Sequence, residues 1–284
     1  MDFAQVSNSK DRIRGWTMRW TKMTLSAGLG ILWSILICGG VPESNAQTNQ
    51  ALDLDKPGLR DLIKASGFIT AKPIPSWGSI IGSKDAAVNL TEGEVVYVQL
   101  ERGKEVQPGD RFSIVRQGEA VTHPVTKKNL GKLVLVPGEL TILGGKGQVV
   151  TAKINKSFRS VQEGDVIIPP QPILPQIVPI RDSKKIKGIV LLSPEGSENI
   201  TEKEVIFIDR GNRDGVIVGD RFSIYQEGSA SIYEDFQKAE KPKLPMVKVG
   251  QAVVVSVQEE TSTALVTHSS QAIYAGDKVV AGKE

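Results

Sequence analysis

Gly219-Asp220-Arg221-Phe222-Ser223-Ile224 occurs twice in this chain, because residues 109–114 have the same six-residue sequence. The offset between the two copies, 219 − 109 = 110, also places Gly78 on Gly188. The same register matches Ser83 with Ser193, Asn89 with Asn199, Thr91 with Thr201, Glu92 with Glu202, Glu94 with Glu204 and Val95 with Val205. A shared register over this length indicates an internal repeat, which governs the whole fold interpretation.

Both repeats have the composition of short β-strands separated by turns. Residues 94–100 and 204–209 are rich in β-branched and aromatic side chains, which is typical of strands. Further strands are expected at residues 112–115, 139–143 and 148–154 and at the matching residues 222–225, 251–257 and 262–267. About five short strands per repeat predict an all-β fold of two tandem small β-barrels, SH3-like or OB-like, with a short N-terminal helix.

The offset between the repeats changes in their second halves. Gly138 matches Gly250, and 250 − 138 = 112, so the second repeat is 112 − 110 = 2 residues longer. We place this insertion in the loop formed by residues 229–245. The same loop mixes both charge signs with prolines, which indicates a solvated segment.

The chain divides into five segments. They are a signal peptide (1–46), an N-terminal segment with a short helix (47–76), β-barrel repeat 1 (77–168), a Pro-rich linker (169–187) and β-barrel repeat 2 (188–284). The prolines of the linker exclude a helix and favour an extended, semi-rigid spacer. The short helix is expected at residues 55–67, with Asp55 as its cap and Gly67 as its stop. We expect its apolar face to dock on the first repeat.

The first 46 residues have the pattern of a secretory signal. A basic start is followed by an uncharged, mostly apolar run from Met23 to Val41, and Ser44-Asn45-Ala46 supplies small residues for cleavage. The alternative is a retained membrane anchor, since the run is close to bilayer-spanning length. Met18 or Met23 is a possible true start, and the single cysteine, Cys38, lies inside this segment. The pattern predicts export to the periplasm or cell envelope.

The charge of the chain gives no indication of nucleic-acid binding. The whole chain has a formal charge of +3; residues 1–46 hold five of its basic and three of its acidic residues, so 3 − (5 − 3) = +1 remains after cleavage. A protein that binds nucleic acid normally presents a basic surface. We therefore expect no nucleic-acid partner.

Four Gly-Asp pairs each precede an apolar strand. They are Gly109-Asp110 and Gly164-Asp165 in the first repeat, and Gly219-Asp220 and Gly276-Asp277 in the second. Glycine adopts positive φ without a Cβ clash, and aspartate closes an Asx turn by accepting a backbone N–H two residues further on. We interpret all eight residues as structural turns, and we expect equivalent substitutions in the two repeats to behave alike.

No other residue pattern predicts a catalytic, metal or cofactor site. His123 and His268 occupy non-equivalent positions without a nucleophile or acid at a suggestive spacing, so we interpret both as structural or surface residues. Residues 144–147, Gly-Gly-Lys-Gly, lack the Walker spacing and are expected to form a hairpin turn. The sequence thus predicts no catalytic residue, no cofactor and no metal.

The turn and strand motifs resemble those of a bacterial envelope family. Residues 204–222 resemble the region that follows the LysM domain in exported LysM proteins, and His123-Pro124-Val125-Thr126 with Leu130-Gly131 is similar to a loop of that family. The second repeat also resembles, more loosely, the C-terminal domain of flagellar assembly protein T. No LysM stretch fits between Gln47 and Gly67, so the resemblance does not imply peptidoglycan binding by a LysM domain.

These observations together predict a non-enzymatic exported protein with a binding or scaffolding role at the cell wall or in an envelope assembly. Its partners would be envelope proteins or peptidoglycan, and it would contact the membrane only through an uncleaved signal segment. One alternative is a flagellar or secretion-system ring component. Another is a carboxylate-dependent cell-wall hydrolase, which requires Asp110 or Asp220 to line a cleft beside a second acid.

Overall fold

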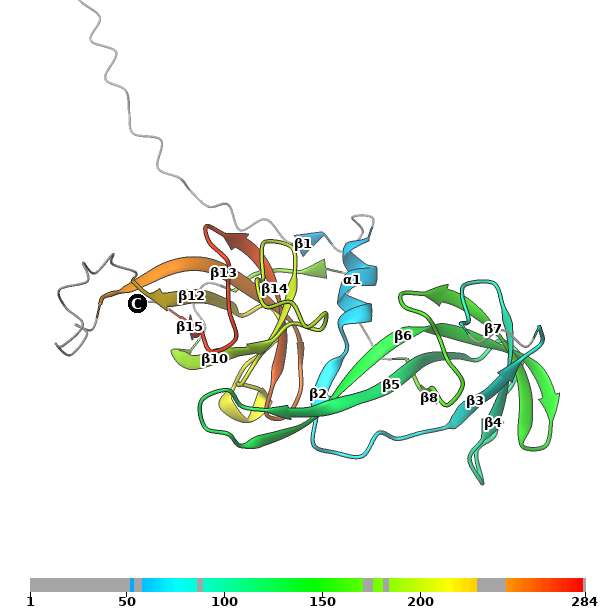
Figure 1. Ribbon diagram of the computed structural model, residues 1–284. Helices are drawn as coiled ribbons and strands as arrows, with labels where there is room; N and C mark the ends of the chain where they lie inside the picture. The colour runs from blue at the N-terminus through cyan, green and yellow to red at the C-terminus, as the bar shows by residue number, and fades with distance from the viewer. Residues whose placement is uncertain are drawn as a thin grey trace, which may run out of the picture. The chain divides into compact units, whose positions relative to one another are not determined.

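The computed structural model describes residues 52–53, 58–85, 89–170, 176–180, 184–228 and 244–282. The predicted signal peptide and nearly all of the predicted insertion loop lie outside these residues. Residues 48–284 belong to one compact unit. The described part of the chain is mostly β, with one short α-helix (Figure 1), which agrees with the predicted class.

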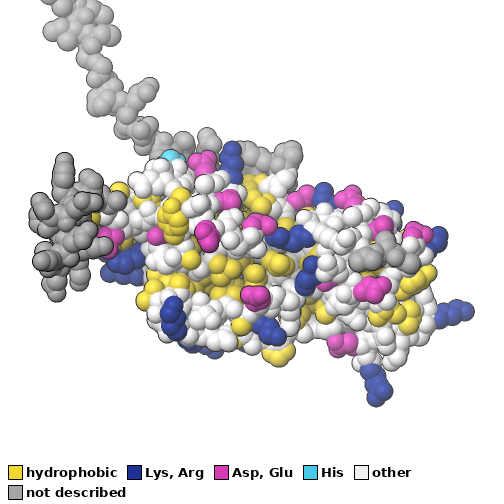
Figure 2. Space-filling model, viewed as in Figure 1, with side chains coloured by type: hydrophobic (Ala, Val, Ile, Leu, Met, Phe, Trp, Pro, Cys, Tyr) yellow, Lys and Arg dark blue, Asp and Glu magenta, His cyan; other side chains and the backbone are white. Residues whose placement is uncertain are grey.

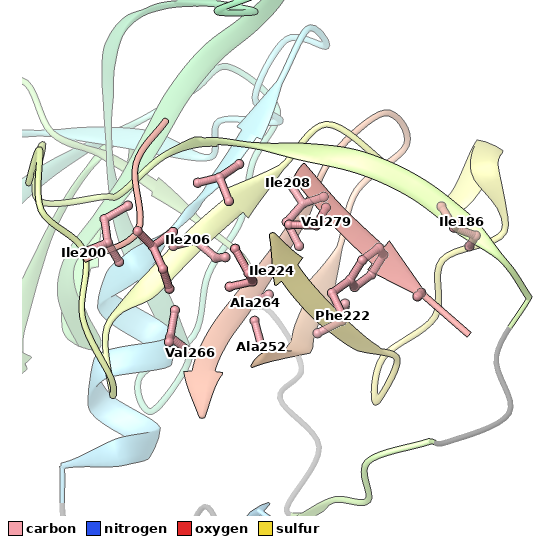
Figure 3. Close-up of a cluster of buried hydrophobic side chains, with 14 of the residues drawn as sticks. Ile186, Ile200, Ile206, Ile208, Phe222, Ile224, Ala252, Ala264, Val266 and Val279 are labelled. Atoms are coloured by element: carbon pink, nitrogen blue, oxygen red, sulfur yellow. The ribbon is translucent and has the colours of Figure 1, made fainter. Parts of the chain in front are cut away.

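The second repeat is a closed antiparallel barrel in the strand order β10-β11-β14-β13-β12-β15. Its strands are β10 (Ile186–Leu192), β11 (Val205–Ile208), β12 (Arg221–Glu227), β13 (Met246–Val257), β14 (Ser262–Ser269) and β15 (Lys278–Ala281). A 3-10 turn, η1 (Asn212–Asp214), follows β11. Inward side chains such as Ile206, Phe222 and Ile224 fill the interior and are fully buried (Figure 3). Burial of such side chains is the main force that closes a small barrel.

The first repeat is a ring-like antiparallel sheet with the same cyclic order of strands. The strands are β3 (Gly78–Ser83), β4 (Val95–Leu100), β5 (Arg111–Thr122), β6 (Asn129–Lys146), β7 (Val149–Ser157) and β8 (Val166–Ile168). They follow the order β6-β5-β8-β3-β4-β7, and β7 pairs again with β6. Each repeat therefore has six strands in its ring, and the expectation of about five was too low. A hairpin joins β6 and β7 as predicted, but its turn lies at residues 147–148, because Gly144 to Lys146 still pair with β7.

The first repeat differs from the second by a long hairpin and an added strand. Strands β5 and β6 extend far beyond the predicted residues 112–115 and 139–143, and bulges interrupt their pairing after Ile114 and Gln117. The short strand β2 (Phe68–Thr70) pairs with β6 as a seventh strand. The extension was missed because its residues alternate polar and apolar side chains less regularly than the ring strands.

The helix α1 (Leu59–Ser66) starts later than predicted and packs on a different repeat. Gly58 precedes it and Gly67 ends it at φ 70°, whereas Asp55 lies outside the described residues. Its apolar side chains, such as Ile63, pack in one cluster with Val205 and Leu265 of the second repeat. The prediction that this face docks on the first repeat was therefore wrong. The helix also contacts the first repeat, where Lys64 forms a 2.6 Å ion pair with Glu139 of β6.

Part of the Pro-rich linker lies directly on the second barrel. Strand β9 (Gln176–Ile177) pairs with β1 (Leu52–Asp53), and Ile177 is buried in the cluster that contains helix α1. Ile180 then forms a parallel bridge with Asp220 and donates its N–H to the Gly219 carbonyl at 2.7 Å. The linker therefore covers a turn of the second barrel that is open at the equivalent point of the first.

Because the linker covers only one of these turns, the equivalent glycines Gly109 and Gly219 have different surroundings. Gly109 and Gly219 have φ values of 97° and 98°, so an alanine at either site is strained by about 1–2 kcal/mol. A Cβ at Gly109 meets nothing within 4 Å, whereas one at Gly219 would lie 2.7 Å from the Val178 carbonyl oxygen. We predict that Gly219→Ala lowers the free energy of unfolding by at least about 1 kcal/mol more than Gly109→Ala, because the linker must move. Urea unfolding of both variants measures this, and equal losses would contradict the linker contact.

Candidate functional site

The two repeats meet where the N-terminal segment and the long hairpin cover the outer face of the second barrel. Ile69 of β2 and Val121 and Leu130 of the β5–β6 hairpin pack against Leu191 and Phe207 in one buried cluster. Hydroxyl groups add polar contacts, because Thr261 Oγ1 donates to the Ile69 carbonyl at 3.2 Å and Thr263 Oγ1 to the Gly67 carbonyl at 3.4 Å. The contact is thus a packed seam with an apolar centre.

His123 joins the hairpin loop to the second barrel. Its Nδ1 accepts hydrogen bonds from the backbone N–H groups of Val125 and Thr126, both at 3.1 Å. The proton therefore resides on Nε2, which lies 3.2 Å from Asp209 Oδ2 and donates to it. Asp209 also accepts the Ile189 N–H at 2.6 Å. Both ring nitrogens are engaged, so the prediction of a structural histidine agrees with this geometry.

His268 has a different environment. Its Nδ1 lies 3.8 Å from Glu202 on the surface of the second barrel, and both side chains are exposed. His268 lies at the C-terminal end of β14, where it pairs with Gln251. The seam contacts the opposite end of this strand, at Thr263. Exposed pairs of this kind contribute little to stability.

A cleft of about 870 Å³ opens beside the seam, and both the N-terminal segment and the second barrel line it. Its apolar lining includes Ile69, Val216 and Ile217, and Ile217 is 52% exposed. Polar lining comes from Asn212, Gln258 and Thr261. A large concave site with an apolar floor and convergent polar groups is the usual form of a binding site.

Charged side chains of both signs form a connected network on the rim of the cleft. Lys72 and Arg213 each lie 2.5 Å from Glu259, and Arg213 and Lys128 lie 2.8 and 3.3 Å from Glu260. The hydrogen bond from Lys72, reinforced by Arg213, lowers the pKa of Glu259. Because most of these side chains are exposed, each ion pair contributes little to stability. The network borders the cleft and leaves its opening free.

All four Gly-Asp pairs form the same turn, but the hydrogen bond runs in the opposite direction to the predicted one. Each glycine has a positive φ, and each aspartate Oδ2 accepts the backbone N–H of the residue three positions earlier. The four donor–acceptor pairs are Gln107 and Asp110, Gln162 and Asp165, Ile217 and Asp220, and Tyr274 and Asp277. None of these aspartates is among the residues that line the cleft. The Asp220 turn nevertheless borders the cleft, because Ile217 and Val218 of that turn line it.

In each repeat, the aspartate of the second Gly-Asp turn accepts a hydrogen bond from a side chain on the third strand of the ring, β5 or β12. In the first repeat, Arg116 donates two hydrogen bonds of 2.7 Å to the buried carboxylate of Asp165. In the second repeat, Gln226, which matches Arg116 because 226 − 116 = 110, donates to Asp277 Oδ2 at 2.6 Å. The hydrogen bonds that Arg116 donates to Asp165 raise the pKa of the Arg116 guanidinium. One repeat thus uses a charged pair where the other uses a neutral amide.

Asp220 differs from its equivalent Asp110 in burial. Asp110 is exposed, whereas Asp220 is only 1% exposed because the linker lies over it. Its Oδ1 has no hydrogen-bond partner within the described part of the chain. Burial raises the pKa of the Asp220 carboxyl, against the opposing effect of the Ile217 N–H.

Sequence reasoning missed the residues that build the seam and the cleft. Asp209, Arg213, Glu259 and Glu260 belong to segments that were read only as strand ends or loops. One signal was available: residues 205–208, Val-Ile-Phe-Ile, are apolar at every position, which indicates a strand buried on both faces. All four are buried in the structure.

Within the described ranges, no group of three or more His, Cys, Asp or Glu residues is placed to hold a metal ion. The same ranges contain no helix with the length and apolar character needed to cross a bilayer. No known family model and no curated protein matches this chain.

The Arg116 pair gives a prediction with an internal control. Asp165→Asn should lower the free energy of unfolding by about 2 kcal/mol, because the buried side chain at this position would no longer give the partly buried Arg116 guanidinium a charged partner. Asp277→Asn should change it by less than about 0.5 kcal/mol, since one amide oxygen can accept both hydrogen bonds that now reach Oδ2. Urea unfolding at neutral pH tests both. Equal losses would show that the charge of the Arg116 pair is unimportant.

Asp220 gives a pH-dependent prediction. Since its folded pKa is raised, its contribution to stability is greatest below its unfolded pKa, about 3.9, and declines as pH rises through the folded value. Asp220→Asn should therefore raise the melting temperature at pH 7, and this gain should disappear below about pH 4. Asp110→Asn, at the exposed equivalent site, is the control and should show no such gain. A gain of equal size at both pH values would contradict the burial effect.

Proposed function

We propose that this protein is a non-enzymatic, exported binding or scaffolding protein of the bacterial cell envelope, and that the cleft beside the seam is its binding site. The observation that carries the proposal is that one large cleft is lined jointly by the N-terminal segment and the second barrel. Ligand-binding sites often lie at the interface between two domains, and this cleft opens beside the junction of the two repeats. The N-terminal pattern of the sequence supports export.

The composition of the cleft favours a partner with both apolar and hydrogen-bonding groups. Ile217 and Val218 offer apolar surface, whereas Asn212 and Gln258 offer amide groups at the same opening. The rim is balanced in charge, and Figure 2 shows both charge signs interspersed over the visible face. A peptide segment of an envelope protein or a strand of peptidoglycan has this character, and a highly charged polymer does not.

Two further observations support a binding role for the fold. The predicted turn carboxylates are engaged in backbone hydrogen bonds, such as that between Asp110 and Gln107 at 2.8 Å. The two rings share one cyclic strand order, and we propose that both are SH3-like or OB-like barrels, which are folds used widely for recognition.

The test combines localisation with capture. The full-length chain, expressed in a bacterium, should fractionate with the envelope, and it should co-sediment with isolated peptidoglycan sacculi or crosslink to envelope proteins. Ile217→Asp should reduce this capture about tenfold, since one buried apolar side chain in an interface contributes about 1.4 kcal/mol or more. Val125→Asp, at a more exposed apolar residue outside the cleft, should leave capture unchanged. Exclusive recovery from the cytoplasm would contradict the proposal.

A further inference from the structure

One outer face of the second barrel carries positive charge. Its cations come from four adjacent strands: Lys187 of β10, Lys278 of β15, Arg221 of β12 and Lys248 of β13. We call these four residues the basic face. Figure 2 shows several Lys and Arg side chains at the lower left of the molecule, where Figure 1 places β10, β12 and β15. The three lysines are exposed, so the face is open to a partner.

Strand pairing groups the lysines around Tyr225. Tyr225 stands opposite Lys278 on one neighbouring strand and opposite Lys248 on the other. The residue before it points into the barrel (Figure 3), so Tyr225 points outward. Lys187 stands opposite Val280, which lies two residues after Lys278 on the same side of β15. These side chains therefore share the outer side of the sheet.

No carboxylate of the described residues balances the lysines of this face. Lys187, Lys248 and Lys278 take part in none of the ion pairs between described residues. Lys278 Nζ instead lies 3.8 Å from Met246 Sδ. Partial desolvation, followed by the positive charge of Arg221, lowers the pKa of Lys248. Like charges thus lie close together, which is unfavourable unless an anion binds between them.

The same face of the first ring is apolar and covered. The offset is 110 for β12 and 112 for β13 and β15, since 225 − 115 = 110, 248 − 136 = 112 and 278 − 166 = 112. The equivalents of Tyr225, Met246, Lys248 and Lys278 are, in that order, Val115, Val134, Val136 and Val166. All four valines belong to one apolar cluster, and Phe68 and Ile74 of the segment before the first ring pack against it.

The two copies therefore use one face of the fold in two ways. The described residues before the second ring take another course, since Val178 lies at Gly219 and Lys184 at Gly215. Lysine suits an uncovered face better than valine does. A face that needed only to be soluble would be served by charges of both signs, whereas this one carries cations of a single sign on four strands. The change of residues points to an anionic partner.

We infer that the basic face binds the surface of a membrane that contains anionic phospholipid. Apolar side chains adjoin the lysines: Met246 and Val247, directly before Lys248, are 39% and 45% exposed, and Tyr225 and Val280 are half-buried between the cations. Cations beside exposed apolar residues are typical of proteins that lie on anionic membranes, because headgroup phosphates attract the cations and apolar side chains enter the acyl boundary. A soluble polyanion would gain nothing from the apolar residues.

This contact goes beyond the expectation from the sequence, under which only an uncleaved signal segment would touch the membrane. It uses only residues of the second barrel, and none of the four cations lines the cleft. Membrane binding is therefore independent of signal cleavage and of what the cleft binds.

The test is co-sedimentation of the predicted mature chain, residues 47–284, which contains the whole compact unit. Vesicles of phosphatidylcholine with phosphatidylglycerol should bind it, and vesicles of phosphatidylcholine alone should not. Binding should disappear in about 1 M salt, where the Debye length falls to about 3 Å. Lys248→Gln/Lys278→Gln should bind about 20-fold more weakly, since each lysine near an anionic surface contributes roughly fivefold. If thermal melts show that this variant is unfolded, Lys187→Gln/Lys278→Gln replaces it.

Two controls separate the basic face from net charge and from the cleft. Lys146→Gln/Lys153→Gln removes the same charge from exposed lysines of the first repeat and should bind like the wild type. Ile217→Ser alters the cleft without changing the charge and should also bind like the wild type. A failure of this inference is thus distinguishable from a failure of the cleft proposal. Equal losses in the two double variants, or equal binding to both kinds of vesicle, would overturn the inference.

A further variant distinguishes a membrane from a soluble polyanion. Met246→Ser should weaken vesicle binding about tenfold, because the methionine side chain leaves water when it enters the membrane boundary. It should leave the binding of inorganic polyphosphate unchanged. If Met246→Ser binds the vesicles as tightly as the wild type, the contact is purely ionic and the assignment to a membrane is overturned.

Discussion

The structure depends on the need to cover strand β11 on both faces. Ile206 and Ile208 point into the barrel, whereas Val205 and Phe207 point outward and would expose large apolar surfaces to water. Helix α1 covers Val205, and β2 with the long hairpin covers Phe207. Burial of this kind contributes roughly 1.5–3 kcal/mol for each large side chain. The N-terminal segment, the hairpin extension and part of the linker all take their positions from that requirement.

Duplication supplied two copies of one ring, and divergence gave them different surroundings. The cyclic strand order and the four Gly-Asp turns are the same in both copies. The linker covers the turn at Asp220, whereas none of the described residues covers the turn at Asp110. A charged Arg116 pair in one ring is a Gln226 pair with a neutral donor in the other. Equivalent residues therefore have different energetics, although their local backbone geometry is shared.

The proposed binding cleft lies where the two copies differ. The cleft forms beside the seam because η1 and the segment at Thr70–Lys72 approach each other there. His123 secures the hairpin loop to Asp209 at the same seam. The repeated residues maintain the rings, whereas the residues present in one copy alone, such as Arg213 and Glu259, define the opening that a partner would enter.

The sequence by itself determined the duplication, the β class, the positions of the central strands of each ring and the positive φ of the four Gly-Asp glycines, because these follow from local residue preferences and from a fixed offset. It did not determine that α1 packs on the second repeat, that Asp220 is buried while Asp110 is exposed, or that His123 reaches Asp209. Each of these depends on which surfaces meet across a long sequence separation. Local pattern encodes which face of a strand is apolar, and only tertiary packing decides what covers that face.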